Sequence, residues 1–267
     1  HNVFNQLVED FTEQGEVILD PFCGGGVTIY EGVIQNRRVI GCDLNPLSIF
    51  IVRNMIKKAD DTSDLEECFA SLREYIESLT NDYMYFELDG RRYDMSWAEM
   101  ALTVRCPKCG RPSTLTNDLK IKNGKYHCLN KYCELSKEGE IDIASCERTE
   151  PQYIFLVSSI NKNRIIKPFE EDDMIRFKAH MKFLKKQIVD NRINIPRDLI
   201  PMACDRQFED GLAKKGILYF QDFFTKRNLM VLLLLKHKIN SYEAKLGAEK
   251  YELVRIMFSN ILKDCNI

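Results

Sequence analysis

The stretch VILDPFCGGG at residues 17–26 decides the fold class of this chain of 267 residues. An apolar run ends there at Asp20, and three glycines lead into a segment with apolar residues at helical spacing. A second apolar run, at 39–42, ends at Asp43, and Asn45-Pro46 begins another helical segment. The order of strand, glycine turn, helix, strand and helix is typical of the start of a doubly wound parallel sheet. The sequence therefore predicts an α/β fold.

The composition is that of a globular protein. Apolar residues make up 45% and charged residues 29%, and 38 basic against 40 acidic residues give a net charge of −2. This balance excludes a disordered tail, a collagen and a coiled-coil rod. The longest apolar run, at 229–235, is far shorter than the roughly 20 residues of a membrane span, and no secretory signal pattern begins the sequence. We therefore expect a cytoplasmic protein with no membrane contact.

The glycine cluster and the acid after the second apolar run together predict a ligand site. Glycines at a strand-to-helix turn let the backbone approach a ligand where a Cβ would clash. Asp43 lies 17 residues after Gly26, where a carboxylate can accept hydrogen bonds from both hydroxyls of an adenosyl ribose. A dinucleotide fingerprint would need glycine in place of Ile29. The acidic Asp20 suits a cationic ligand such as S-adenosylmethionine better than a pyrophosphate. A glycine turn without a ligand is the alternative.

Two segments resemble motifs of a known family. DPFCGGG at residues 20–26 resembles the DPFCGSG motif of S-adenosylmethionine-dependent DNA amino-methyltransferases, and GCDLNP at 41–46 resembles their GxDxNP strand end. RNA methyltransferases share part of this pattern. The resemblance implies a Rossmann-like methyltransferase sheet, present here in part, in which Asp43 holds the cofactor ribose. The residues that we expect to contact the cofactor are Asp20, Pro21, Phe22, Cys23, Gly24, Gly26, Asp43, Leu44 and Asn45.

Four cysteines form a second motif, with the spacing C-x2-C-x18-C-x4-C. Two pairs of thiolates suit a tetrahedral zinc ion, which would stabilise a segment poor in apolar residues. The predicted ligands are Cys106, Cys109, Cys128 and Cys133, with His127 as an alternative to the last. A closed set of four thiolates leaves no open position, so the predicted role is structural. Four buried thiols without a metal are the other interpretation.

Basic residues gather in two stretches of this nearly neutral chain. Seven Lys or Arg stand against one acid both at 105–131 and at 174–197, whereas 134–150 carries six acids and two bases. Solvated surface charge is the plain interpretation of either stretch alone. Two such stretches suggest a surface that faces a polyanion. Within the zinc ribbon, phosphate contacts are expected from Arg111, Lys120, Lys122 and Lys125.

The last third of the chain predicts a strand at 153–157 and helices near 170–190, 225–239 and 242–263. Segments 195–201 and 220–229 resemble the IPxxYIP…DLFTxRQL region of adenine-type DNA methylases that carry a zinc ribbon. Thr225 is expected to cap a helix. Arg227 is expected to contact a phosphate, cap a carboxylate or form a surface salt bridge.

We divide the chain into three regions. They are an S-adenosylmethionine-binding α/β region at 1–95, the zinc ribbon at 96–150, and a mainly helical region at 151–267 that contacts DNA or recognises the target. The predicted fold class is thus α/β, with a partial Rossmann-like sheet, an inserted zinc ribbon and a mainly helical C-terminal region.

The acceptor loop of the family is missing from this sequence. Amino-methyltransferases of this kind hold the target amine and stack the flipped base with a [DNS]PP[YFW] loop. None of the eight prolines follows another, so the loop is absent and we assign no catalytic residue. Three explanations remain open: the N-terminal part of a longer enzyme, a split enzyme whose partner supplies the loop, and a non-catalytic subunit.

The favoured interpretation is the cofactor-binding and DNA-contacting portion of a site-specific DNA methyltransferase acting on adenine-N6 or cytosine-N4. Transfer would pass directly from the sulfonium to the amine, with catalysis by positioning. The alternatives are a non-catalytic zinc-ribbon specificity module that binds DNA, and an RNA methyltransferase.

Overall fold

The computed structural model describes residues 2–57, 62–202, 209 and 211–265. The chain divides into two compact units, one formed by residues 1–74 with 235–266 and the other by residues 75–234. The boundaries between the units fall within α4 (Ser63–Thr80), after residue 74, and within α7 (Lys226–Asn240), after residue 234. The division of the sequence into three functional regions stays a prediction.

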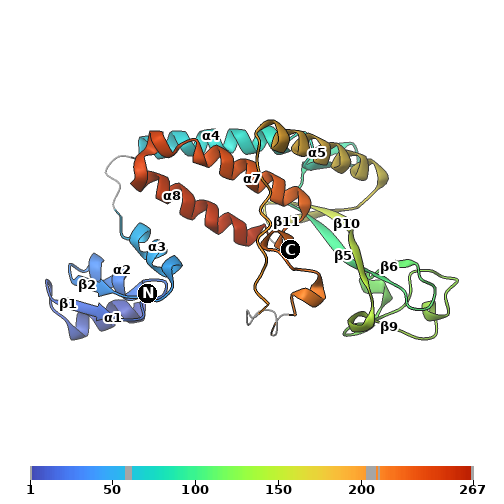
Figure 1. Ribbon diagram of the computed structural model, residues 1–267, viewed down its shortest axis with the longest axis horizontal. Helices are drawn as coiled ribbons and strands as arrows, with labels where there is room; N and C mark the ends of the chain where they lie inside the picture. The colour runs from blue at the N-terminus through green and yellow to red at the C-terminus, as the bar shows by residue number, and fades with distance from the viewer. Residues whose placement is uncertain (1, 58–61, 203–208, 210, 266–267) are drawn as a thin grey trace. The chain divides into compact units, whose positions relative to one another are not determined.

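The first unit begins with the predicted α/β arrangement. Two parallel strands pair from Val17 opposite Arg38 to Asp20 opposite Gly41. The elements in order are α1 (Asn2–Phe11), β1 (Val17–Asp20), α2 (Val27–Ile34), β2 (Arg38–Gly41) and α3 (Pro46–Met55) (Figure 1). Because the strands are parallel, the loops after their carboxyl ends lie side by side, where α/β sheets bind ligands. The mixed α/β fold is therefore confirmed.

The other elements described in the first unit are helices. Helix α8 (Glu243–Asp264) contains one non-helical residue, Gly247, at φ 69° and ψ 165°, so the helix kinks there. Two ion pairs join α8 to the start of α4: Lys245 Nζ lies 2.7 Å from a carboxylate oxygen of Glu67, and Lys250 Nζ lies 3.0 Å from one of Asp64. The helix predicted near 242–263 is thus present. Among the described residues, no helix is both long and apolar enough to cross a membrane.

An antiparallel sheet frames the second unit. Its strand order is β11-β10-β5-β6. This sheet consists of β5 (Trp97–Arg105), β6 (Pro112–Thr114), β10 (Arg148–Ile160) and β11 (Asn163–Pro168), whereas β3 (Tyr85–Leu88) and β4 (Arg91–Asp94) form a separate two-stranded antiparallel sheet. Strand β10 contains the predicted strand at 153–157. The ribbon is inserted between β5 and β10, whose pairing of Val104 with Arg148 holds its two ends together (Figure 1).

Helix α5 (Glu171–Asp190) packs in the second unit against the end of α4 and the start of α7. Their shared core consists of Leu79, Leu184, Ile188, Met230 and Leu234. Thr225 caps α7 as predicted, because its Oγ1 accepts a hydrogen bond from the backbone N–H of Asn228 at 3.2 Å. The helices predicted near 170–190 and 225–239 are therefore present.

The first turn of α5 is fixed by a buried acid. Asp173 is 2% exposed and accepts hydrogen bonds from Lys167 Nζ at 2.6 Å and from Arg176. The backbone N–H of Glu170 also donates to Asp173, at 3.1 Å. Lys167 lies on β11, so this network ties the helix to the sheet and sets which face of α5 is buried. Breaking one partner of such a buried pair is strongly destabilising.

The core of the second unit also contains a fully buried histidine. His180 shares a hydrogen bond of 2.9 Å between its Nε2 and the carbonyl oxygen of Leu79, which fixes the proton on Nε2. Its ring stacks on Tyr83 with centroids 4.6 Å apart. Burial first, and then the nearby charge of Arg227, lower the pKa of His180 from 6.5 to about 4, against the opposing effect of the Leu79 hydrogen bond. The imidazole is therefore neutral in the folded protein at neutral pH.

This depressed pKa predicts an acid-sensitive second unit. Below pH 6.5 His180 is protonated in the unfolded chain but stays neutral in the folded protein. The free energy of unfolding therefore falls as the pH drops toward 4. We expect a loss of about 2 kcal/mol between pH 7 and pH 5 from this residue, from its pKa difference. Denaturant titration followed by the fluorescence of Trp97, the single tryptophan, measures it.

The variant His180→Gln should remove this part of the pH dependence. Glutamine keeps an N–H donor for Leu79 and does not titrate. The exposed histidine of α7, His237, provides the control His237→Gln, which should keep the wild-type profile. Equal pH profiles in wild type and His180→Gln would contradict the assignment.

Candidate cofactor and zinc sites

The two loops at the carboxyl ends of β1 and β2 are joined by one carboxylate. Asp43 accepts a hydrogen bond from the backbone N–H of Gly24 at 2.8 Å and another from that of Asn45 at 2.7 Å. These donors, first Asn45 and then Gly24, hold the pKa of Asp43 below its ordinary value. Asp43, which is predicted to bind a ribose, thus also connects the glycine loop to the second loop through hydrogen bonds.

Backbone hydrogen bonds extend the parallel pairing into these loops. The N–H of Cys42 donates to the carbonyl of Asp20 at 2.8 Å, and the N–H of Cys23 donates to the carbonyl of Cys42 at 2.9 Å. The Asp20 carboxylate accepts the N–H of Phe22 at 3.1 Å. Both loops are therefore held in one conformation by the chain itself.

All nine residues predicted to contact the cofactor lie at this edge of the sheet. Asp20 is the last residue of β1, five residues belong to the loop after β1, and three belong to the loop after β2. Phe22 and Leu44 are almost fully exposed, at 86% and 102%, and Asp20 is half-buried. The amide of Asn45 is already occupied, since its oxygen caps α3 by accepting the N–H of Leu47 at 3.0 Å. The loops therefore offer an open surface with two acids.

The glycines of the loop differ in whether a side chain could replace the glycine hydrogen. A Cβ on Gly26, whose φ is +78°, would lie 2.4 Å from the side chain of Val52, so only glycine fits there. A Cβ on Gly25 would meet nothing within 4 Å. The serine of the DPFCGSG motif would therefore fit at this position.

The two loop cysteines differ in burial. Cys23 is buried with Ile29 and Val52, and burial followed by the charge of Asp43 raises the pKa of its thiol. Cys23 is therefore a packing residue, whereas Cys42 is exposed.

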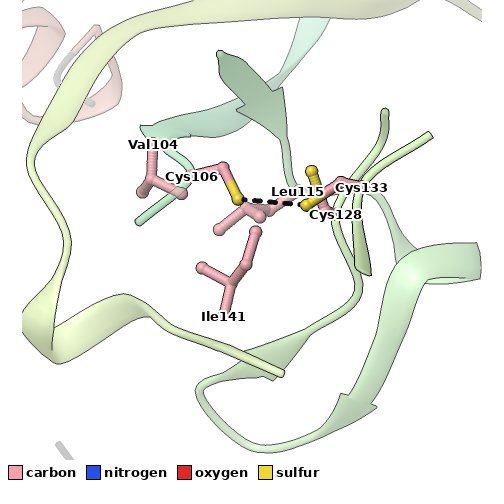
Figure 2. Packing of buried hydrophobic residues seen from close by; sticks show 6 residues of the cluster. All are labelled: Val104, Cys106, Leu115, Cys128, Cys133 and Ile141. Atoms are coloured by element: carbon pink, nitrogen blue, oxygen red, sulfur yellow. Dashed lines mark hydrogen bonds between the residues drawn. The ribbon is translucent and has the colours of Figure 1, made fainter. Parts of the chain in front are cut away.

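The four ribbon cysteines meet in space. Their sulfurs all lie within 4.8 Å of one another. Cys106 Sγ and Cys133 Sγ are 3.8 Å apart (Figure 2), as are Cys109 Sγ and Cys128 Sγ. Sulfurs at the corners of a tetrahedron, each about 2.3 Å from a central zinc, are separated by about 3.8 Å. The cluster therefore has the dimensions of a zinc site.

Backbone groups of the ribbon point at these sulfurs. The N–H two residues further along donates to each of Cys109, Cys128 and Cys133. That donor lowers the pKa of Cys109 to about 6, whereas burial raises the pKa of Cys128 to about 12. Four thiolates at this distance need a cation to balance their charge, and a Zn²⁺ ion would fit this requirement. His127 is not part of the cluster, which favours Cys133 as the fourth ligand.

Apart from the cysteines, the ribbon has only a small buried hydrophobic core in the part of the chain that the structure describes. Its buried cluster contains three aliphatic side chains, Val104, Leu115 and Ile141, around the cysteines (Figure 2). The only regular structure beyond β6 consists of single-turn helices and short strands, β7 (Lys120–Lys122), β8 (Lys125–Tyr126) and β9 (Ile141–Asp142), within the described residues. Such a small core does not stabilise a fold of this length alone.

A comparison with models of known protein families identifies the family of this chain. The family model for D12 class N6 adenine-specific DNA methyltransferases matches residues 1–200. The chain belongs to this family. The match contains both cofactor loops, the cysteine cluster and the start of the helical region, and the family implies S-adenosylmethionine as methyl donor and DNA as substrate. No curated protein and no solved structure matches the chain.

The basic stretch of this D12 methyltransferase ribbon is largely paired with acids. Lys122 lies 3.9 Å and Lys125 lies 2.9 Å from the carboxylate of Glu140, and Lys125 also lies 2.7 Å from that of Asp142. Lys108 pairs with the ribbon's own Glu134 at 2.8 Å. Two of the four residues predicted to contact phosphate are thus neutralised internally, whereas Arg111 and Lys120 are exposed.

Arg227 occupies a different environment from the one predicted. It is 8% exposed, with its guanidinium 4.1 Å from the ring centre of Phe177 and 5.7 Å from that of Tyr153. Its Nε and Nη1 are buried without a hydrogen-bond partner in the described part of the chain, and burial lowers its pKa. The prediction of a surface salt bridge or phosphate contact is therefore wrong. The helical spacing of the sequence does indicate burial of Arg227, because this residue falls on the same helical face as the buried Met230 and Leu234.

Proposed function

We propose that this chain is the cofactor-binding and DNA-contacting part of a site-specific DNA methyltransferase that transfers methyl from S-adenosylmethionine to the N6 amine of adenine. The observation that carries the proposal is the Asp43 carboxylate, which joins the glycine loop to the second loop at the carboxyl edge of the sheet. The family match favours adenine over cytosine as the target. DNA as substrate agrees with the cytoplasmic location expected from the sequence.

The loop residues fit the proposed cofactor. Each carboxylate oxygen of Asp43 accepts one backbone N–H, and the carboxylate also accepts a hydrogen bond from the side chain of Ser48. Of its roughly four acceptor positions, one remains that a ribose hydroxyl can use. The half-buried Asp20 places a negative charge beside the same loop, which suits the sulfonium and amino group of the ligand. When bound, the cofactor supplies an electrophilic methyl group. The residues of this chain hold and orient it.

We propose that the acceptor loop comes from a segment outside this chain, later in the same polypeptide or in a partner protein. Val17, Leu19 and Ile40 lie on one face of the two-stranded sheet and are 53%, 63% and 54% exposed. Parallel sheets are normally covered on both faces. A further segment that covers this face would bury the three side chains and bring an acceptor loop to the carboxyl edge.

The ribbon is proposed to be a structural zinc module. Four thiolates fill the coordination shell and leave no position for a substrate. Its ends are held by β5 and β10, so a folded ribbon would present a fixed surface to a macromolecule.

Substitution of Asp43 tests the cofactor site. Asp43→Ala removes an acceptor for two backbone N–H groups and for the ribose, so we expect affinity for S-adenosylmethionine to fall more than tenfold, since hydrogen bonds to a charged group contribute about 1.5–3 kcal/mol each. Asp43→Asn keeps one acceptor oxygen and should lie between wild type and Asp43→Ala. Isothermal titration calorimetry gives the three affinities.

Two measurements complete this test. Asp94→Ala, at an exposed acid on β4, is the matched control and should bind like wild type. Circular dichroism shows whether Asp43→Ala remains folded. Equal affinity of wild type and Asp43→Ala would exclude the ribose assignment.

A second candidate function is a non-catalytic specificity module, favoured by the absence of the [DNS]PP[YFW] loop. Such a module has no need of a cofactor, so tight binding of S-adenosylmethionine by the isolated chain would argue against it. An RNA methyltransferase is distinguished by comparing duplex DNA with structured RNA as methyl acceptors for the complete protein.

A further inference from the structure

Helix α5 carries a row of four lysines on its outer face. Lys178, Lys182, Lys185 and Lys186 follow one another at intervals of four, three and one, so they share one side of the helix. All four are exposed. The other side is buried through residues that include Phe177, His180, Leu184 and Ile188. Because that side is packed and the first turn is tied to β11 through Asp173, the orientation of the row is fixed.

No acid neutralises this row within the described residues. None of its lysines takes part in an ion pair there, and no Asp or Glu occurs between Met174 and Val189. The acids of α5 stand at its ends, where Asp173 is buried and already paired. In the ribbon, by contrast, Lys108, Lys122 and Lys125 all lie against carboxylates, and Arg111 and Lys120 are exposed. Two basic stretches that look alike in sequence therefore differ in the charge that they present.

The dimensions of the row suit a nucleic-acid backbone. Nine residues from Lys178 to Lys186 span about 12 Å at 1.5 Å per residue. Each strand of duplex DNA carries a phosphate roughly every 3.4 Å of its axis. A rigid helix face with four free ammonium groups can therefore contact several consecutive phosphates.

We propose that the lysine row of α5, and not the zinc ribbon, is the main phosphate-contacting surface of this chain for duplex DNA. This inference rests on the proposed function, since duplex DNA is the polyanion that a DNA methyltransferase must hold. The contact is independent of base sequence, because lysines on phosphates position a duplex without reading it. The row supplies affinity, and sequence recognition comes from other residues.

Matched double variants test this proposal. Lys182→Gln with Lys186→Gln removes two charges from the row, and Lys108→Gln with Lys122→Gln removes two charges from paired, exposed positions of the ribbon. Fluorescence anisotropy with a labelled DNA duplex of about 25 base pairs, at several salt concentrations, gives the affinity and its salt dependence. Each lost phosphate contact lowers the slope of log K against log salt by about 0.9.

We expect the row variant to lose about two units of this slope and at least tenfold in affinity at low salt, and the ribbon variant to stay within twofold of wild type. An unchanged row variant beside a DNA-binding wild type would overturn the inference and leave the proposed function intact. A wild type that binds no duplex DNA would overturn both. Tighter, row-dependent binding of duplex RNA than of DNA would overturn the choice of DNA. Circular dichroism of all variants checks that α5 remains helical.

Discussion

Removal of the metal with a chelator is expected to unfold the zinc ribbon. The sulfurs of Cys106, Cys109, Cys128 and Cys133 have the spacing of a tetrahedral zinc site, and three aliphatic side chains complete the buried cluster. Metal binding to such sites contributes about 10–16 kcal/mol in zinc-finger peptides, far more than so small a core. Elemental analysis should give about one zinc per chain, and chelation should abolish the protection of the ribbon from hydrogen exchange.

Single substitutions identify the ligands. Cys106→Ser and Cys133→Ser should each lose most of the bound zinc, because three thiolates leave the shell open. Cys146 packs against the same cluster without belonging to it, so Cys146→Ser is the matched control and should keep the metal. Zinc that is retained in Cys133→Ser and lost in His127→Ala would reassign the fourth ligand. A ribbon that stays folded without metal would contradict the site altogether.

The parts of the fold that could be predicted from the sequence are those with local causes. The apolar runs ending at Asp20 and Asp43 predict two strands. Each run is short, and a local signal ends it: the glycine turn after the first run and the helix cap at Asn45 after the second. The cysteine spacing predicts the cluster, because a tetrahedral ion needs two pairs of ligands that a short loop can bring together. The thiol set and the α/β start are therefore confirmed by distances and register.

Features with distant causes could not be predicted in the same way. Strand β10 extends well beyond the predicted run at 153–157, because its length comes from pairing with β5 and β11. The pairing of β8 with β9 sets Lys125 opposite Asp142. Lysines of the basic stretch therefore form ion pairs with carboxylates of the acidic stretch that follows it. This register distinguishes the paired lysines of the ribbon from the row on α5, whose lysines form no ion pair in the described part of the chain.

Arg227 shows how an extended motif can mislead about the role of a single residue. Its place in a motif of polar residues suggests a contact at the surface. The helical spacing that it shares with Met230 and Leu234 instead buries it against Phe177. A charge near the start of a helix is therefore best judged by the face on which it falls.

The chain alone is expected to bind S-adenosylmethionine and duplex DNA but to transfer no methyl group to DNA. Binding of the cofactor needs only the two loops joined by Asp43. Transfer also needs the adenine amine in line with the sulfonium methyl, and a displacement of about 1 Å can cost roughly 10²-fold in rate. No proline pair exists in the sequence, so no [DNS]PP[YFW] loop holds the amine and stacks the base.

A labelled-methyl assay on duplex DNA decides this prediction. The chain alone should give incorporation at background level, and addition of a segment or partner protein that carries the acceptor loop should restore it. Restored activity should then disappear in Asp43→Ala and persist in Asp94→Ala, which connects turnover to the cofactor loops of this chain. Robust incorporation by the 267-residue chain alone would mean that other residues hold the amine, and the open sheet face of Val17, Leu19 and Ile40 would then need no covering segment for catalysis.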